Sequence, residues 1–353
     1  MCKSVKEASS SSQASQPAAA ASFAGQMTCL SVVTALLAVY CKFTFVDDST
    51  YPPKAPLHSY KIPLALTSLY LLSLPLLKSL KLPNPKSLLL PAMLLYNVFQ
   101  VLLNLYTVLL ILSSLSSGHP FIGSTSSPLC SLPLWIHYTN KYLEFLDTSF
   151  MLLRQRYDQV SFLHVYHHFT ITWAWYIGVL LWPSGDSYFG ALLNSGIHVL
   201  MYGYYSMTLM GLSCPWKKYL TLAQLCQFVS VVIYTCGCVY YNWEVLEAKH
   251  FTAMAVQVGE MASLFFLFGR FYKKSYKVKK GEKKDDLHID ECQNAIEESV
   301  ENDMYVDQCA AAVKEGVVGL NEVGGVVYSR VTVGGKEKLH KKAVEKNSWS
   351  MVG

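Results

Sequence analysis

Charged side chains are scarce in this sequence: Asp, Glu, Lys and Arg together make up 15% of its 353 residues. Soluble domains carry about 25% charged residues, whereas here 52% of the residues are apolar and the mean hydropathy is +0.26. This shortage of charge excludes an ordinary soluble domain and predicts an integral membrane protein. We expect no nucleic acid among its partners.

The sequence has no tandem repeat, and its hydrophobicity is unevenly distributed. Residues 1–26 form a Ser/Ala-rich segment of low complexity that we expect to be disordered. Residues 276–353 form a charged tail, expected to be cytosolic and mostly disordered, in which VVYSRVTV predicts a short strand. The membrane domain is predicted at 55–275, preceded by an extra hydrophobic segment at 27–46.

Seven apolar segments of about 20 residues, the length needed to cross a bilayer, are predicted to be transmembrane helices. They are 62–82, 86–114, 131–153, 161–183, 187–211, 219–240 and 251–272. Residues 28–46 are an eighth candidate, but Lys42 within them equally favours a signal-like or interfacial segment. The predicted fold class is therefore all-α, with seven transmembrane helices or eight.

Lysine and arginine alternate between successive connections, which predicts the orientation because positive charges stay on the cytoplasmic side. The basic connections are those near residue 84, at Arg154 and Arg156, at Lys217 and Lys218, and after residue 272. The intervening connections hold one lysine in total. The tail and every second connection are therefore expected to face the cytosol.

The ten cysteines do not form a disulfide framework, because most of them lie in apolar segments or in the tail. Three are expected near the lumenal face, namely Cys130, Cys236 and Cys238. One disulfide between Cys130 and either of the others is compatible with the sequence, and so are unpaired thiols.

Polar residues inside the apolar segments fall into four clusters, KYLEFLDT, HVYHH, NSGIHVLMYGYY and TLAQLCQ, on four successive predicted helices. Spacings of three, four or seven put the members of each cluster on one helical face. Intramembrane polar residues are costly and by default functional, so we expect the four faces to meet in one cavity open to the cytosol. The members are Lys141, Glu144, Asp147, Thr148, His164, His167, His168, Asn194, His198, Tyr202, Tyr205, Thr221, Gln224 and Gln227.

A structural role is the alternative for each cluster, because polar side chains also hydrogen-bond neighbouring membrane helices. This alternative stays open for single Gln and Thr residues, and the Lys141–Glu144 pair would also serve to lock helices together. It is weakest for the histidines. Joining two helices requires one imidazole, whereas HVYHH and the next helix supply four.

Two kinds of chemistry suit these histidines. HxxHH occurs in membrane di-iron enzymes, but their sites need several such boxes and this sequence has no second one. A zinc site of His164, His168 and His198 is compatible with the residue types. The other chemistry is metal-free acyl transfer, because a neutral imidazole in an apolar setting is a nucleophile toward thioesters. The apolar helices would then hold the acyl chain and the basic cytosolic rim would hold coenzyme A.

The four motifs, in this order and spacing, closely resemble the signatures of the ELO-type very-long-chain fatty acid elongases over about residues 55–275. The resemblance implies a 3-ketoacyl-CoA synthase of the endoplasmic reticulum that condenses acyl-CoA with malonyl-CoA and releases carbon dioxide and CoA. It also implies six helices in a barrel around an acyl tunnel, with no bound metal or other cofactor. The ketoacyl-CoA reductase, dehydratase and enoyl reductase of the elongation cycle are the expected protein partners.

The resemblance also assigns roles to residues. His167 is expected to be the nucleophile that holds the acyl group, and His198 its partner at the reacting carbon. His164, His168 and Asn194 complete the catalytic set. The expected substrate-binding residues are Lys141, Glu144, Asp147, Tyr202, Tyr205, Gln224, Gln227, Lys217 and Lys218.

The strings QVSFLHVYHH and WPSGDSYFGALLNS resemble the polyunsaturated-substrate branch of the family more than the saturated one. The chain ends in SMVG rather than in a dilysine signal, so residence in the reticulum follows from the resemblance and the topology. Side chains near Trp182 or Tyr234 are expected at the far end of the tunnel. Two other function classes stay open: a metal-dependent lipid oxidoreductase and a seven-helix transporter or receptor.

The distribution of Lys and Arg predicts a topology that can be tested directly. A tag placed after Gly353 should be accessible in cells in which only the plasma membrane is permeabilised, and a glycosylation acceptor inserted near Ser124 should be modified. An unmodified acceptor at Ser124 together with a glycosylated tail would invert the topology and place the histidine cluster away from cytosolic CoA.

Overall fold

The computed structural model describes residues 23–45, 59–123, 128–183 and 185–275, together with the backbone of three strands between residues 320 and 339. The chain divides into two units, Met1–Ser275 and Tyr276–Gly353. Each unit is considered by itself. The predicted disorder of residues 1–26 and of most of the tail falls largely outside the described residues.

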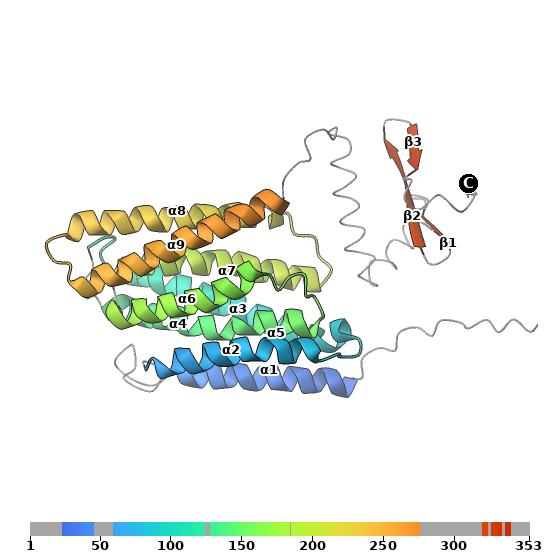
Figure 1. The fold of residues 1–353 in the computed structure, drawn as a ribbon, viewed down its shortest axis with the longest axis horizontal. Coiled ribbons are helices and arrows are strands. Elements are labelled where there is room, and N and C mark those ends of the chain that lie inside the picture. Colours follow the sequence, from blue (N-terminus) through green and yellow to red (C-terminus); the bar gives the residue numbers. More distant parts are fainter. Residues whose placement is uncertain are drawn as a thin grey trace, which may run out of the picture. The chain divides into compact units, whose positions relative to one another are not determined.

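The described part of the first unit is helical (Figure 1). Its helices are α1 (Phe23–Thr44), α2 (Lys61–Ser79), α3 (Pro85–Ser116), α4 (Ser131–Leu143), α5 (Phe145–Leu153), α6 (Phe162–Leu181), α7 (Tyr188–Leu209), α8 (Lys217–Asn242) and α9 (Ala248–Ser275), with a 3-10 turn at Pro128–Cys130 before α4. The prediction of an all-α membrane domain is therefore confirmed.

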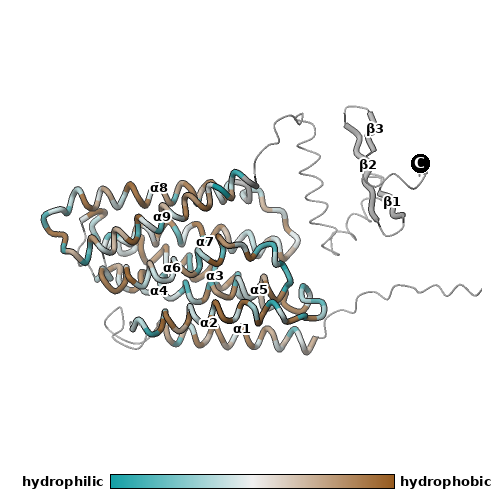
Figure 2. Tube along the Cα trace, viewed as in Figure 1, coloured by the Kyte–Doolittle hydropathy of each residue, from teal (hydrophilic) through white to brown (hydrophobic). Residues whose placement is uncertain are grey.

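Five helices of the described part are long and apolar enough to cross a membrane: α1, α2, α3, α8 and α9. Seven or eight such helices were expected from the sequence. The segment 131–153 falls short because it is interrupted at Glu144, which leaves α4 and α5 too short singly. The helices α6 and α7 have sufficient length, but their His, Trp and Tyr residues lower the hydropathy. Figure 2 shows hydrophobic residues along the helices and hydrophilic ones mainly toward their ends.

The helices lie side by side, and several helices that are distant in sequence pack on one another (Figure 1). The longest helix, α3, packs on α1, α4 and α7. On the other side, α9 packs on α6 and α8, while α7 also contacts α8. The helix α4 contacts α6, and α2 contacts α5 and α6. The four segments that carry the polar clusters are thereby gathered within one bundle.

The extra hydrophobic segment is a helix that packs on this bundle. In α1, Val33 and Leu37 are buried in an apolar cluster with residues of α3. Its last residue, Thr44, accepts a hydrogen bond from Trp135 Nε1 at 3.2 Å through its carbonyl oxygen, and its hydroxyl donates to Thr139 Oγ1 at 3.2 Å. The segment therefore contacts α4, the helix that begins the first polar cluster, whereas its sidedness and its role in activity stay predictions.

The cysteines near the predicted lumenal face are free thiols in the structure. Cys130 and Cys238 are buried in one apolar cluster, and Cys236 is exposed. Of the two alternatives compatible with the sequence, the structure therefore has the unpaired thiols.

The second unit contains a three-stranded antiparallel sheet in the order β1 (Leu320–Val323), β2 (Val326–Val333) and β3 (Lys336–Leu339). The central strand is VVYSRVTV, so the predicted strand is confirmed. The all-α class consequently applies to the first unit and not to the whole chain.

Candidate active site

A buried ion pair lies at the junction of α4 and α5. Lys141 Nζ is 2.7 Å from Glu144 Oε1, and each of the two side chains is only 1% exposed. The same oxygen accepts a hydrogen bond from Asn140 Nδ2 at 3.3 Å. A charge buried without a partner is strongly unfavourable, so each of these two groups requires the other.

The ion pair is joined to α7 at two points. Lys141 Nζ donates a hydrogen bond to Asn194 Oδ1 at 3.0 Å, and His198 Nδ1 lies 3.1 Å from Glu144 Oε1 without hydrogen-bond geometry. Residues 194 and 198 are one turn apart, so one face of α7 presents both to the pair. The first and third polar clusters therefore form one network.

A second buried chain of hydrogen bonds extends this network away from the histidines. Tyr202 donates to Asp147 Oδ2 at 2.7 Å, and its hydroxyl is 3.4 Å from that of Tyr96 on α3. Tyr96 in turn accepts from Gln100 Nε2 at 3.2 Å. The tyrosine rings at 202 and 205 are 5.9 Å apart, as expected for one stripe on α7. Sequence reasoning missed the residues of α3, although the spacing of its polar residues was the available signal; these are Asn97, Gln100, Asn104 and Thr107.

The histidines of HVYHH divide between two sides of α6. His164 Nε2 lies 2.8 Å from Thr148 Oγ1 on α5, and its ring is 4.4 Å from that of His168. These two residues are four apart and therefore share a face. His167 lies on a different face, and its ring is 6.2 Å from that of Phe268 on α9. The local fold is set by Ser161, which caps α6 by accepting from the backbone N–H of His164 at 3.2 Å.

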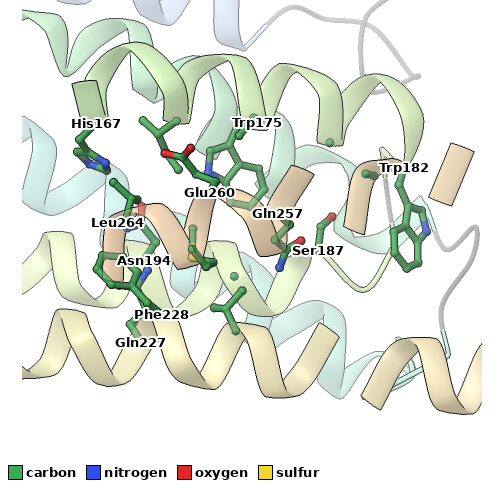
Figure 3. Close-up of a pocket in the computed structure, with 17 residues that line it drawn as sticks. His167, Trp175, Trp182, Ser187, Asn194, Gln227, Phe228, Gln257, Glu260 and Leu264 are labelled. Atoms are coloured by element: carbon green, nitrogen blue, oxygen red, sulfur yellow. The ribbon is translucent and has the colours of Figure 1, made fainter. Parts of the chain in front are cut away.

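A channel runs along the face of α6 that carries His167 (Figure 3). Its walls come from α6, α7, α8 and α9 and are mostly apolar. The polar residues His167, Asn194 and Gln227 lie toward one end, and Trp182 lies at the other (Figure 3). From residue 167 to residue 182, α6 rises about 22 Å at about 1.5 Å per residue. The lining residues therefore extend over a distance comparable with the length of a long hydrocarbon chain, and most of them are apolar.

The end of the channel at Trp182 is held by one carboxylate. Asp186 Oδ2 accepts from the backbone N–H of Gly123 at 3.0 Å and from Asn242 Nδ2 at 3.3 Å. Gly123 has φ of +96°, and a Cβ there would lie 3.1 Å from Asn242 Oδ1. This position therefore favours glycine for both its backbone conformation and its close approach. The bonds join the connections α3–α4 and α6–α7 to the last residue of α8.

A buried histidine that the sequence reasoning did not select, His137, supports the channel wall. His137 lies one turn before Lys141 on α4, and its Nδ1 is 2.9 Å from Ser195 Oγ on α7. Its ring is edge-on to the channel residue Trp175, with centroids 4.4 Å apart. The signal in the sequence was its spacing of four from Lys141, which places both residues on one face of the helix.

The structure brings most of the selected residues together but distributes them over two layers. His167, Asn194 and Gln227 line the channel. The remaining selected residues of α4, α5 and α7 lie outside its lining, in the network described above. Gln224 is half-buried and is not among the lining residues. Lys217 and Lys218 begin α8, and their side chains lie outside the described residues.

The histidines do not converge on one point as metal ligands would. His164 is engaged by Thr148, and His198 is directed at Glu144. Within the part of the chain that the structure describes, no group of three or more His, Cys, Asp or Glu residues is placed to hold a metal ion. The geometry instead presents one imidazole to an apolar channel. The Nδ1 of His167 is buried without a hydrogen-bond partner, so Nε2 is the ring nitrogen that can reach a bound molecule.

Comparison with known proteins gives matches over the membrane domain. A family model described as "ELO: GNS1/SUR4 family" matches residues 55–284. The chain is 36% identical to very long chain fatty acid elongase 4 of Homo sapiens over 197 residues, which are 52% of this chain and 62% of that protein. It is 39% identical over 207 residues to very long chain fatty acid elongase 5 of Tachysurus fulvidraco (55% and 68% of the two chains) and 44% identical over 166 residues to that of Rattus norvegicus (46% and 53%). The matched region thus spans about half to two thirds of these relatives.

The buried pair predicts a strong coupling between two substitutions. Lys141→Met and Glu144→Gln should each lower the free energy of unfolding by about 3–5 kcal/mol, because each leaves the other group buried without its partner. In the double variant, the free energy of unfolding should fall by far less than the sum of the two single losses. Melting temperatures of the purified variants in detergent would measure this coupling.

The exposed pair Lys249–Glu247, at 3.0 Å, provides a matched control. Lys249→Met should leave the melting temperature unchanged, since exposed ion pairs contribute little. Additive losses in the Lys141/Glu144 double variant would show that the two groups do not stabilise each other.

Proposed function

The chain belongs to the ELO (GNS1/SUR4) family, and on this premise we propose that it is a condensing enzyme of fatty acid elongation. It joins a long-chain acyl-CoA with malonyl-CoA to give a 3-ketoacyl-CoA, carbon dioxide and CoA. The observation that carries the proposal is the position of His167. This imidazole is the member of HVYHH that lines an apolar channel of about the length of a long acyl chain.

The proposed architecture follows from the helix contacts. The contacts α3–α7, α7–α8, α8–α9, α9–α6, α6–α4 and α4–α3 close a ring, which supports a six-helix barrel around the acyl tunnel. The helices α1 and α2 would lie outside it. We place the protein in the membrane of the endoplasmic reticulum with the His167 end of the channel toward the cytosol, where CoA thioesters and the other three enzymes of the elongation cycle are accessible.

The first half of the proposed reaction is acyl transfer. His167 Nε2 attacks the thioester carbonyl, the C–S bond breaks, and CoA leaves as the thiol after taking the proton from the imidazole. The acyl group is then bonded to the imidazole with its chain in the channel. Asn194, which Lys141 holds at 3.0 Å, supplies an amide beside the reacting carbon.

The second half is decarboxylation and condensation. Malonyl-CoA loses its carboxylate as carbon dioxide, and the resulting enolate attacks the acyl-imidazole carbonyl. The C–N bond breaks, the imidazole regains a proton, and 3-ketoacyl-CoA leaves. His198 and Asn194 stabilise the enolate, and Glu144 orients His198. His164 and His168 hold the start of α6 against α5 and thereby position His167. No step requires a metal.

The remaining selected residues have supporting roles in this proposal. Asp147, Tyr202 and Tyr205 keep α5 and α7 in register below the ion pair. Gln227 lines the channel at its polar end and Gln224 lies one turn nearer the start of α8. Lys217 and Lys218 would bind the phosphates of CoA. The resemblance of QVSFLHVYHH to the polyunsaturated branch supports polyunsaturated acyl chains as the substrates.

A condensation assay tests the function. Purified full-length protein, incubated with a polyunsaturated long-chain acyl-CoA and radiolabelled malonyl-CoA without NADPH, should form labelled 3-ketoacyl-CoA. Stoichiometric metal in the purified protein, with no condensation product, would instead favour a metal-dependent lipid oxidoreductase. Specific binding of acyl-CoA without any turnover would favour a transporter or receptor.

The assignment of His167 makes a sharper prediction. CoA should be released from acyl-CoA before malonyl-CoA is added, and mass analysis should find the acyl adduct on His167. His167→Ala should abolish this release, whereas His198→Ala should still become acylated and then fail to condense. If acyl-CoA stays intact until malonyl-CoA arrives in a fully active preparation, His167 is not the nucleophile, although the protein would still be an elongase.

A further inference from the structure

The channel carries two polar side chains that the proposed chemistry does not use. Glu260 and Gln257 on α9 lie between His167 and Trp182 (Figure 3). Glu260 is 8% exposed and lies well inside an apolar helix. An intramembrane carboxyl is costly and by default functional. Its place in the channel wall therefore points to a ligand in the channel.

The contacts of Glu260 leave half of its carboxyl for the channel. Thr170 Oγ1 on α6 donates to Glu260 Oε1 at 2.7 Å. No ion pair or side-chain hydrogen bond in the described residues engages Oε2, and this oxygen is not among the buried atoms without a partner. Since Glu260 lines the channel, Oε2 is left to face it.

Gln257 repeats this arrangement one turn farther from His167. Its Nε2 donates to Thr235 Oγ1 on α8 at 3.2 Å, and a Cβ on the facing Gly190 would lie 3.5 Å from the same Nε2. Thus each of the two polar groups is fixed by one threonine of a neighbouring helix. The polar side chains of Gln257 and Glu260 are three residues apart, about 4.5 Å along the helix axis, in the otherwise apolar wall that α9 contributes to the channel.

The depth of these groups can be compared with an acyl chain attached to His167. Thr170, which bonds Glu260, is three residues beyond His167, or about 4.5 Å along α6. An extended chain advances about 1.3 Å per carbon, given C–C bonds of about 1.5 Å. Glu260 therefore lies beside about carbons 4–6 and Gln257 beside about carbons 7–10.

On the basis of the proposed function, we propose that Glu260 and Gln257 form a subsite that recognises cis double bonds near the thioester end of the acyl chain. A saturated chain would leave Glu260 Oε2 and the second N–H of Gln257 buried without a partner, which is unfavourable. The π electrons of a double bond accept weak hydrogen bonds from O–H and N–H donors, which here are the Oε2–H of protonated Glu260 and the second N–H of Gln257. Methylene-interrupted double bonds recur every third carbon, a spacing close to that between the two side chains. The preferred substrates are therefore polyunsaturated chains whose first double bond is close to the thioester.

Three acyl-CoA substrates of equal chain length test the proposal in the full-length protein. Stearoyl-CoA is saturated, linoleoyl-CoA has its first double bond far from the thioester, and γ-linolenoyl-CoA has it nearer. The wild type should have the highest kcat/KM for condensation with γ-linolenoyl-CoA. Glu260→Leu should reduce the ratio of kcat/KM for γ-linolenoyl-CoA to kcat/KM for stearoyl-CoA about three- to tenfold. Glu260→Gln, which retains an N–H donor, should preserve most of this ratio. Gln257→Leu should reduce the preference for both unsaturated chains.

Phe265→Leu on the outer, half-exposed face of α9 is the matched control and should retain the wild-type ratio. Thr170→Val, which removes the bond that fixes Glu260, should lower the ratio as well, and it replaces Glu260→Leu if that variant does not fold. If Glu260 only joins α6 to α9, its variants will lower kcat/KM equally for all three substrates, and the proposal is overturned. A wild type that condenses none of them would instead refute the proposed function itself.

Discussion

The arrangement of the site depends on one constraint: the buried charges of Lys141 and Glu144 must stay together. At 1% exposure neither has access to water, so each needs the other and further polar neighbours. Besides Asn140 on α4 itself, the polar neighbours come from α7, and they are Asn194 and His198. The ion pair therefore fixes the rotation of α7 relative to α4, and this rotation directs Asn194 into the channel.

The polar network around Lys141 and Glu144 thus forms a layer that supports the apolar lining of the channel. The ion pair, the Asp147–Tyr202 hydrogen bond and the contact of His164 with Thr148 lie outside the channel lining. The channel itself receives few polar atoms, and His167 is the histidine among them. This separation keeps a reactive imidazole in a largely apolar environment while the costly polar groups are satisfied elsewhere. In the proposed reaction, removing a member of this supporting layer would act through the positions of His167 and Asn194.

Local spacing explains which parts of the site could be predicted from the sequence. Contacts three or four residues apart, such as Lys141–Glu144 and His198–Tyr202, follow from helix geometry alone and are present in the structure. The separation of His167 from His164 and His168 depends on which helix each face meets, and spacing does not reveal that. The polar wall of α9 was missed for the same reason, although Glu260 stood out as a carboxyl in an apolar segment. The helix break at Glu144 was also missed, because no Gly or Pro in the sequence marks it.

The carboxylate of Asp186 has a consequence for the length of the acyl chain that the channel can hold. It joins the connections α3–α4 and α6–α7 to the end of α8 beside Trp182, so the wall at that end cannot easily withdraw from a growing chain. In the proposed reaction carbons are added at the opposite end, next to His167. Each round would therefore press the methyl terminus closer to the same fixed stop, until the thioester no longer reaches the imidazole. The distance from His167 to this fixed end would then set the maximum length of the acyl chain that can be elongated.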